Sequence, residues 1–172
     1  SFNQINGGSI KLDIAKKNKA KLIYFSTSEI YGDPQKLNIP NKEPYRGNVS
    51  SLGQRACYDE SKRLGETLCY IYNTYFNLHT NIRRPFNIYG PGMRQFDYRI
   101  FPNFASNIIN NKKINIYGSG NQTRTYCYVS DGIIGFLRVM ALGKSGDVYN
   151  IGNNKPEVSV KDIYTILKKI YN

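Results

Sequence analysis

Two residues four positions apart, Tyr58 and Lys62, have the types and spacing of a general base. Residues at positions i and i+4 lie on one face of a helix, so the lysine ammonium would lie close to the phenol. A nearby positive charge favours the phenolate and lowers the pKa of tyrosine from about 10 toward working pH. Such a tyrosine can take the proton of a carbinol while hydride leaves to a nicotinamide. The spacing alone is weak evidence, because most such pairs are only neighbours on a half-exposed helix.

Hydroxyl side chains follow a short apolar run at residues 22–25. The run is typical of a buried parallel strand, so Ser26, Thr27 and Ser28 would lie just past the carboxyl end of that strand. Ligands bind at that edge in open α/β sheets. A hydroxyl there can hold a substrate hydroxyl against the tyrosine, although hydroxyls at this place can also be simple strand-end caps. Glu29 follows directly and adds an acid to the same loop.

Composition excludes several other chemistries. The chain of 172 residues has one histidine, His79, which cannot build a zinc site or a Ser-His-Asp triad, so no metal site is expected. The three cysteines, Cys57, Cys69 and Cys127, show no metal or disulfide spacing, which indicates reduced thiols in a cytoplasm. No apolar run approaches the ~20 residues of a membrane span, so no membrane partner is expected.

The formal net charge of +12 raises the question of a nucleic-acid partner. The lysines and arginines are scattered, however, and the tightest cluster, residues 16–21, lies at the end of a predicted helix. Cations are favourable at that end of the helix dipole. A solvated basic face is the better interpretation, and no nucleic-acid partner is expected.

Helices and strands are predicted to alternate along the chain, which indicates an α/β fold with a mainly parallel sheet. A helix over residues 8–19 is predicted from Ile10, Ile14 and Ala15 at helical spacing. The other predicted elements are a strand at 21–25, a long loop at 31–54, a helix at 56–77 bearing the Tyr–Lys pair, a strand at 80–84, a loop at 86–92, a helix at 101–110, a strand at 114–117, an extended segment at 124–129 and a strand at 148–151. Ser130 and Asp131 are predicted to cap a helix through residue 142. Residues 159–162 are predicted to open a last helix as a variant capping box.

Five ordered segments together resemble the extended short-chain dehydrogenase/reductase family, whose members are NAD-dependent nucleotide-sugar epimerases, dehydratases and decarboxylases. The segments are STSEIYGDP (26–34), CYDESKR (57–63), RPFNIYGP (84–91), YGSGNQTR (117–124) and YVSD (128–131). Each segment is weak evidence alone, but all five in this order are specific. The resemblance extends from about residue 3 to the C-terminus.

The resemblance implies an α/β fold with a partial Rossmann-like, doubly wound parallel sheet and a small C-terminal substrate-binding region. Residues 1–90 are expected to form the C-terminal part of the NAD-binding domain. Residues 91–172 are expected to form mostly the nucleotide-sugar-binding region, with some elements returning to the core. Family members begin with a strand and a glycine-rich turn for NAD, and here Gly118 and Gly120 instead follow a late strand. About the first third of a family member is therefore expected to be missing.

The resemblance also implies roles for particular residues. The expected catalytic residues are Thr27, Ser28, Glu29, Tyr58, Lys62 and Arg124. The expected NAD-binding residues are Ser26, Tyr58, Lys62 and Pro85. The expected nucleotide-sugar contacts are Tyr31, Asn87, Arg94, Tyr117 and Arg124. Plainer interpretations remain open: Glu29 as a solvated loop acid, Arg124 as a surface strand residue, and Asn87 as a turn former.

Within the family, the pair Ser28–Glu29 favours members that decarboxylate UDP-glucuronate to UDP-xylose through a 4-keto intermediate. The 4,6-dehydratases carry an aspartate where Ser28 stands, and a serine is too weak an acid to protonate the departing C6 hydroxyl. The 4-epimerases usually lack a glutamate at the position of Glu29. The implied cofactor is NAD, and the implied partners are a UDP-sugar and a second copy of the chain in a homodimer. The alternatives are 4-epimerisation, 4,6-dehydration and, in another class, a non-catalytic sugar-nucleotide-binding module.

Overall fold

The computed structural model describes residues 2–94 and 97–171. The chain divides into two compact units, each of which is built from two segments of the sequence. Unit 1 comprises Ser1–Phe86 and Gly132–Ile151, and unit 2 comprises Asn87–Asp131 and Gly152–Asn172. Within the described ranges, no helix has the length and apolar character needed to cross a membrane.

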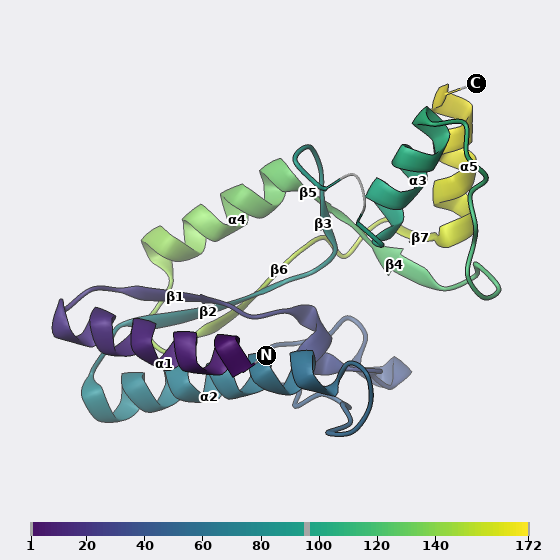
Figure 1. Ribbon diagram of the computed structural model, residues 1–172. Coiled ribbons are helices and arrows are strands. Elements are labelled where there is room, and N and C mark those ends of the chain that lie inside the picture. The colour runs from purple at the N-terminus through teal and green to yellow at the C-terminus, as the bar shows by residue number, and fades with distance from the viewer. Residues whose placement is uncertain (1, 95–96, 172) are drawn as a thin grey trace. The chain divides into compact units, whose positions relative to one another are not determined.

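A three-stranded parallel sheet forms the centre of unit 1 (Figure 1). Its strands are β1 (Leu22–Phe25), β2 (Thr80–Pro85) and β6 (Val148–Ile151), in the order β1-β2-β6. The central strand is buried from Thr80 to Arg84, as expected for a parallel strand covered on both faces. The prediction of an α/β fold with a parallel sheet is therefore confirmed.

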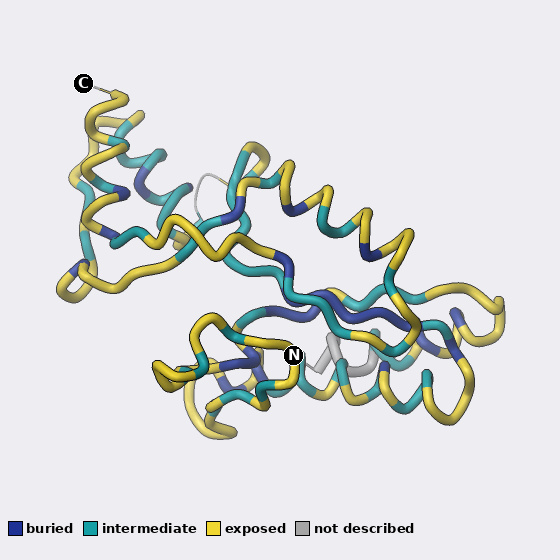
Figure 2. Tube along the Cα trace, turned by 180° about the vertical axis from the view of Figure 1, so that it is seen from behind, coloured by how far each residue is buried: buried dark blue, intermediate teal, exposed yellow. Residues whose placement is uncertain are grey.

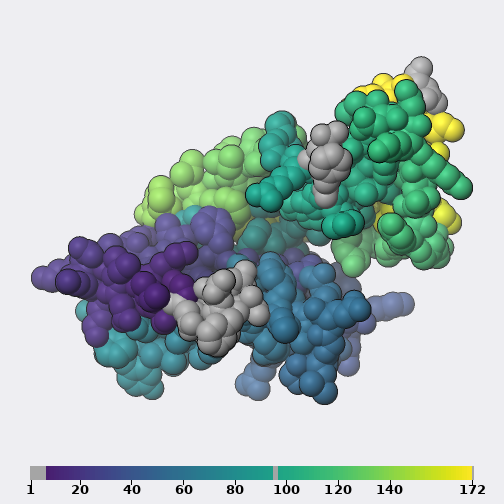
Figure 3. Space-filling view, viewed as in Figure 1, coloured from purple at the N-terminus to yellow at the C-terminus, as the bar shows by residue number. Residues whose placement is uncertain are grey.

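Helices cover both faces of this sheet (Figure 1). The helices α1 (Phe2–Lys17) and α2 (Ala56–Phe76) lie side by side on one face, and Figure 3 shows their side chains in contact. The helix α4 (Val129–Leu142) covers the other face, where Phe136 packs edge-on against Phe25 with 4.9 Å between ring centroids. The outward side of α4 is exposed along its length (Figure 2).

The buried face of α1 does not include Ile10 or Ile14. Leu12 and Ala15 are buried in the core with Cys69, whereas Ile10 and Ile14 are 58% and 56% exposed. Positions two residues apart point about 200° away from each other around a helix, so Ile10 and Ile14 cannot share the face of Leu12. The prediction of a helix is confirmed, with the bounds Phe2–Lys17 in place of residues 8–19.

The segment between β1 and α2 is largely irregular, as predicted for residues 31–54. It contains two short 3-10 turns, η1 (Ser28–Tyr31) and η2 (Lys36–Asn38). Buried polar groups tie the segment to the sheet. Arg84 of β2 donates hydrogen bonds to the Tyr31 hydroxyl at 2.7 Å and to the backbone oxygen of Glu43 at 2.9 Å. The loop therefore has a fixed course although it has little regular structure.

The described residues of unit 2 form two small two-stranded sheets and two helices. Its elements are β3 (Ile88–Tyr89), α3 (Ile100–Ile109), β4 (Thr123–Thr125), β5 (Cys127–Tyr128), β7 (Glu157–Ser159) and α5 (Val160–Tyr171). The strands β3 and β5 are parallel, and β4 and β7 are antiparallel. Phe104 of α3 packs with Val160 and Ile163 of α5 to form the core of this unit.

Three predictions about this part of the chain are wrong. The loop predicted at residues 86–92 contains the short strand β3, which pairs with β5. Residues 114–117 form no strand, although Ile114 and Ile116 do pack against the core of unit 2. Their alternation reflects one buried side of an extended segment, without a partner strand to bond its backbone. Ser130 and Asp131 also do not cap α4, because the helix begins at Val129 and includes them in its first turn.

The capping box predicted for the last helix is confirmed. The backbone N–H of Ser159 donates to the Asp162 carboxylate at 2.8 Å, and the N–H of Asp162 donates to the Ser159 hydroxyl at 3.1 Å. These bonds satisfy two donors at the start of α5. The Ser159 hydroxyl donates to the same carboxylate at 2.7 Å, and this bond, together with the one from the Ser159 N–H, lowers the pKa of Asp162 below its usual value.

Candidate active site

The helix α2 packs closely against β1, and this contact positions the Tyr–Lys pair. Gly65 lies directly against Tyr24 of β1, where a Cβ atom would collide with the tyrosine hydroxyl. The Tyr24 hydroxyl donates a hydrogen bond to the backbone oxygen of Lys62 at 3.4 Å. Because Gly65 has no side chain, the first turns of α2, with Tyr58 and Lys62, can approach the carboxyl end of the strand.

The Lys62 ammonium lies between the strand end and the phenol ring. Its Nζ donates to the backbone oxygen of Phe25 at 2.8 Å and lies 5.9 Å from the centroid of the Tyr58 ring. Burial lowers the pKa of Lys62, since the charged form is partly desolvated. Tyr58 is 38% exposed, so its phenol remains accessible from solvent. The two groups are therefore neighbours at the edge where a ligand of a parallel sheet would bind.

The hydroxyl residues occupy this edge as predicted, and they also have structural roles. The Thr27 hydroxyl accepts a hydrogen bond from the backbone N–H of Glu29 at 3.3 Å and so caps η1. Ser26 is 4% exposed, and its Oγ has no hydrogen-bond partner among the described residues. Ser28 is partly buried and begins η1. A buried hydroxyl without a partner is uncommon and is consistent with an acceptor supplied by a ligand.

Pro85 ends β2 at the same edge of the sheet. The two strands pair in register with Phe25 opposite Arg83, so Thr27 and Pro85 each lie two residues beyond that pair. Pro85 lies at the same sheet edge as Ser26, Thr27 and Ser28. This position agrees with the role expected for Pro85 in cofactor binding, and that role stays a prediction.

Glu29 has a partner that sequence reasoning missed. Its Oε2 lies 2.5 Å from a terminal nitrogen of Arg55, the residue that precedes α2. The available sequence clue was a cation three residues before Tyr58, on the same helical face. Glu29 is therefore not a solitary loop acid.

Tyr31 lies in the core of unit 1. Its side chain is 1% exposed, and its hydroxyl donates to the Asn150 side chain at 2.8 Å while accepting from Arg84. Protein groups therefore surround the side chain, and the structure does not place it on an open pocket wall as a sugar contact requires.

In unit 2, Asn87 lies in the turn after β2 and forms hydrogen bonds with residues of β4 and β5. Its Nδ2 donates to the backbone oxygen of Thr125 at 3.0 Å, and its own backbone oxygen accepts from Cys127 N–H at 3.2 Å. Its φ of 40° lies in the left-handed region that asparagine tolerates. Arg124 precedes Thr125 and is exposed, with one guanidinium nitrogen 2.7 Å from the backbone oxygen of Thr123. Unit 2 thus places Asn87 beside the strand that carries Arg124.

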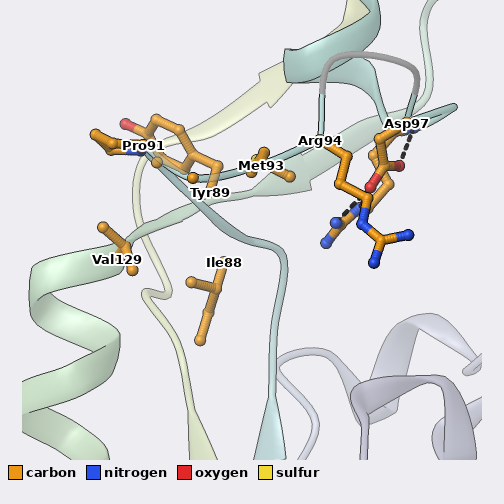
Figure 4. Close-up of a pocket in the computed structure, with 10 residues that line it drawn as sticks. Ile88, Tyr89, Pro91, Met93, Arg94, Asp97 and Val129 are labelled. Carbon is orange, nitrogen blue, oxygen red and sulfur yellow. Dashed lines mark hydrogen bonds and ion pairs between the residues drawn. The ribbon is translucent and has the colours of Figure 1, made fainter.

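Arg94 lines a cavity of about 510 Å³ in unit 2 (Figure 4). The cavity also contains the turn at residues 90–92, Asp97 and Arg99. Arg99 binds the Asp97 carboxylate at 2.5 Å and lowers the pKa of Asp97 to about 2. Two arginines and one aspartate give the lining a net positive charge, which favours an anion. Arg99 was missed at the sequence level, where the only clue was a second basic residue shortly after Arg94.

Tyr117 is 80% exposed and lines a smaller cavity of about 70 Å³ in the same unit. Tyr98, Asn103 and Gln122 line it as well, and Gln122 donates to the backbone oxygen of Tyr117 at 3.3 Å. The position of Tyr117 therefore agrees with the expected contact to a nucleotide, and that role remains a prediction.

Known proteins are similar over nearly the whole chain. The profile of the "NAD dependent epimerase/dehydratase family" matches residues 3–152. UDP-glucuronic acid decarboxylase 3 of Arabidopsis thaliana is 39% identical over 161 residues, which are 94% of this chain and 46% of that protein. UDP-glucuronic acid decarboxylase 1 of Xenopus tropicalis is 40% identical over 159 residues, which are 92% of this chain and 37% of that protein. The chain thus spans less than half the length of these relatives.

A solved structure of similar fold is the UDP-glucuronic acid 4-epimerase of Bacillus cereus in complex with UDP-glucuronic acid and NAD. It superposes with a TM-score of 0.80 at 31% identity, covering 97% of this chain and 51% of that one. This similarity confirms the partial Rossmann-like α/β fold. With the profile match over residues 3–152, it shows that the chain belongs to the NAD dependent epimerase/dehydratase family.

Proposed function

We propose that the native polypeptide that carries this chain is an NAD-dependent nucleotide-sugar enzyme that decarboxylates UDP-glucuronate to UDP-xylose. The observation that carries the proposal is the position of Lys62, which lies beside the Tyr58 ring and bonds to the backbone oxygen of Phe25 at the carboxyl end of β1, two residues before Thr27. Identities of 39–40% to UDP-glucuronic acid decarboxylases support this reaction over others in the family.

The residues at the sheet edge fit a nicotinamide nucleotide. The buried Ser26 hydroxyl lacks a partner among the described residues, and the Lys62 ammonium lies beside the phenol. Ser26, Tyr58, Lys62 and Pro85 would hold the cofactor. NAD, when bound, supplies the acceptor and later the donor of a hydride.

The chain's own groups handle the protons and charges of the reaction. Thr27 orients the C4 hydroxyl, and Tyr58 takes its proton as hydride leaves C4. The resulting 4-ketone lies β to the carboxylate and accepts the electrons released when carbon dioxide departs. Glu29 and Arg124 are the candidates for handling the carboxylate and protonating C5. Tyr58 returns its proton to the C4 oxygen when hydride comes back. Arg124 can instead pair with the diphosphate, together with Asn87 and Arg94.

The direct test is carbon dioxide release from carboxyl-labelled UDP-glucuronate by the native polypeptide in the presence of NAD. We expect labelled carbon dioxide and UDP-xylose in equal amounts. A protein that binds NAD and UDP-glucuronate but releases no carbon dioxide would reject decarboxylation.

A second candidate function is 4-epimerisation, which the 31% identity to UDP-glucuronic acid 4-epimerase supports. The same base would act at C4, and the sugar would keep its carboxylate. The same assay separates the candidates, since an epimerase would yield UDP-galacturonate. The 4,6-dehydratase reaction and a non-catalytic UDP-sugar-binding module would yield neither product from UDP-glucuronate.

The pH dependence of the reaction should show the lowered pKa of Lys62. The proposed base Tyr58 depends on the positive charge of the adjacent ammonium, and burial lowers the pKa of Lys62 from its ordinary value of 10.5. Lys62 therefore loses its proton at a lower pH than an ordinary lysine. As pH rises, kcat/KM should begin to fall before pH 10.5 is reached. Arginine keeps its charge to a pH above about 12, so K62R should have a lower rate but no such alkaline decline.

The measurement is kcat/KM for UDP-glucuronate from pH 6 to 11 in the wild type and in K62R. Lys36→Arg, at an exposed loop position, serves as the control and should keep the wild-type profile. An unchanged alkaline limb in K62R would assign that limb to another group.

We also propose that the enzyme works in the cytoplasm as a homodimer, without a nucleic-acid or membrane partner. Support for the dimer comes from exposed apolar side chains on the paired helices α1 and α2. Ile14 is 56% exposed, and Tyr70 is 61% exposed. Cys57, Cys69 and Cys127 are free thiols, in agreement with a reducing compartment.

A further inference from the structure

Arg55 connects two parts of unit 1 that carry different groups of the candidate site. The residue precedes α2, and its guanidinium reaches the Glu29 carboxylate in η1 at 2.5 Å. The two side chains are 65% and 45% exposed. Such exposed pairs contribute little to stability, so stabilisation of the fold does not by itself account for an arginine at this position.

Backbone hydrogen bonds fix Arg55 relative to the proposed base. Its backbone oxygen accepts from Tyr58 N–H at 2.9 Å and from Asp59 N–H at 3.1 Å. Glu29 is fixed in a similar way, because its N–H is bonded to the Thr27 hydroxyl. The guanidinium therefore spans from the first turn of α2 to the turn that Thr27 caps. These two elements carry the groups that would hold the C4 hydroxyl of the sugar.

In a uronic acid, the carboxylate is attached to C5, the ring carbon next to the C4 that bears the hydroxyl. When Tyr58 and Thr27 hold that hydroxyl, the carboxylate must lie within a few bond lengths of them. A guanidinium has five N–H donors in a planar fork and can bind two carboxylates at once. Without Arg55, the negative charge of Glu29 would repel the substrate carboxylate.

We propose that Arg55 determines specificity for an acidic sugar. Its guanidinium binds Glu29 in the free protein and binds the sugar carboxylate in the complex, so that a uronate is preferred over the corresponding neutral sugar. The inference rests on the proposed function, because it places the C4 hydroxyl at Tyr58.

The test compares two ligands that differ only at C6. Titration calorimetry of the native polypeptide with NADH, which cannot accept a hydride and so prevents turnover, measures Kd for UDP-glucuronate and for UDP-glucose. In R55Q, we expect Kd for UDP-glucuronate to rise about tenfold or more, as for loss of a charge-assisted hydrogen bond. Kd for UDP-glucose should change less than about twofold, since it has no carboxylate. R55K should be intermediate because it keeps the charge but loses the planar fork.

Arg138→Gln is the matched control, since it removes the same charge from an exposed position on α4 and should change neither Kd. The double variant R55Q with E29Q should recover part of the UDP-glucuronate affinity, because the repulsion has gone. Equal weakening of both ligands in R55Q would assign Arg55 a purely structural role, and no weakening would deny it any role, so either result overturns the proposal. Binding needs no turnover. A protein that releases no carbon dioxide but loses uronate selectivity in R55Q would therefore reject the reaction and keep this inference.

Discussion

Replacement of Tyr58 by phenylalanine should reduce carbon dioxide release from UDP-glucuronate by about a thousandfold, within the range that general acid–base groups contribute. The change removes one oxygen and keeps the ring. The phenol is 38% exposed, and the hydrogen bond between Ser61 and residue 58 uses the backbone oxygen of Tyr58, so the helix should be unaffected. Labelled carbon dioxide under single-turnover conditions, with NAD and enzyme in excess over substrate, measures the effect.

Tyr70→Phe provides the control, because Tyr70 lies on the same helix and is 61% exposed. It should keep the wild-type rate. UDP-glucuronate binding to Y58F should remain within about a few-fold of wild type, since the phenol acts mainly in the transition state. A Y58F variant that retains most of its rate would show that another group takes the C4 proton.

Local sequence patterns predicted β1 and α2, the two elements that position Thr27, Tyr58 and Lys62. A four-residue apolar run and an i, i+4 pair were enough to place Thr27 and Lys62, because both depend on short-range geometry. The hydrogen bond from Lys62 to Phe25 depends on how α2 docks on β1. The sequence sign of this docking is Gly65. Its role becomes clear only when Tyr24 is known to lie against it.

The predictions that failed, and the contact that was missed, concern residues whose structure depends on tertiary contacts. The segment at residues 114–117 alternates like a strand, but it packs one side on the core of unit 2 without a partner strand. Tyr31 lies two residues after Glu29 in η1 and is nevertheless buried, with its hydroxyl hydrogen-bonded to Arg84 and Asn150. Arg55 and Glu29 are 26 residues apart, so no local pattern could pair them.

The buried ion pair between Arg84 and Glu66 should be the most sensitive point for folding. Two guanidinium nitrogens bind the two carboxylate oxygens at 2.9 and 2.6 Å, and the side chains are only 8% and 14% exposed. R84M should lower the free energy of unfolding by about 3–5 kcal/mol, because it leaves a buried carboxylate without its partner. The hydroxyl of Tyr31 and the backbone oxygen of Glu43 lose a donor as well.

Urea denaturation of the native polypeptide measures this loss, and two further variants identify its cause. R84M combined with E66L should recover most of the stability, since it removes both charges and keeps apolar volume. R55Q, which breaks an exposed Arg–Glu pair, should cost no more than about 1 kcal/mol. If R84M and R55Q cost the same, burial would not be the source of the effect. A large loss in R84M that E66L restores would show that the unpaired carboxylate is what destabilises. Any loss that E66L does not restore would measure how much Arg84 stabilises the loop between β1 and α2, and thus the turn that holds Thr27 and Glu29.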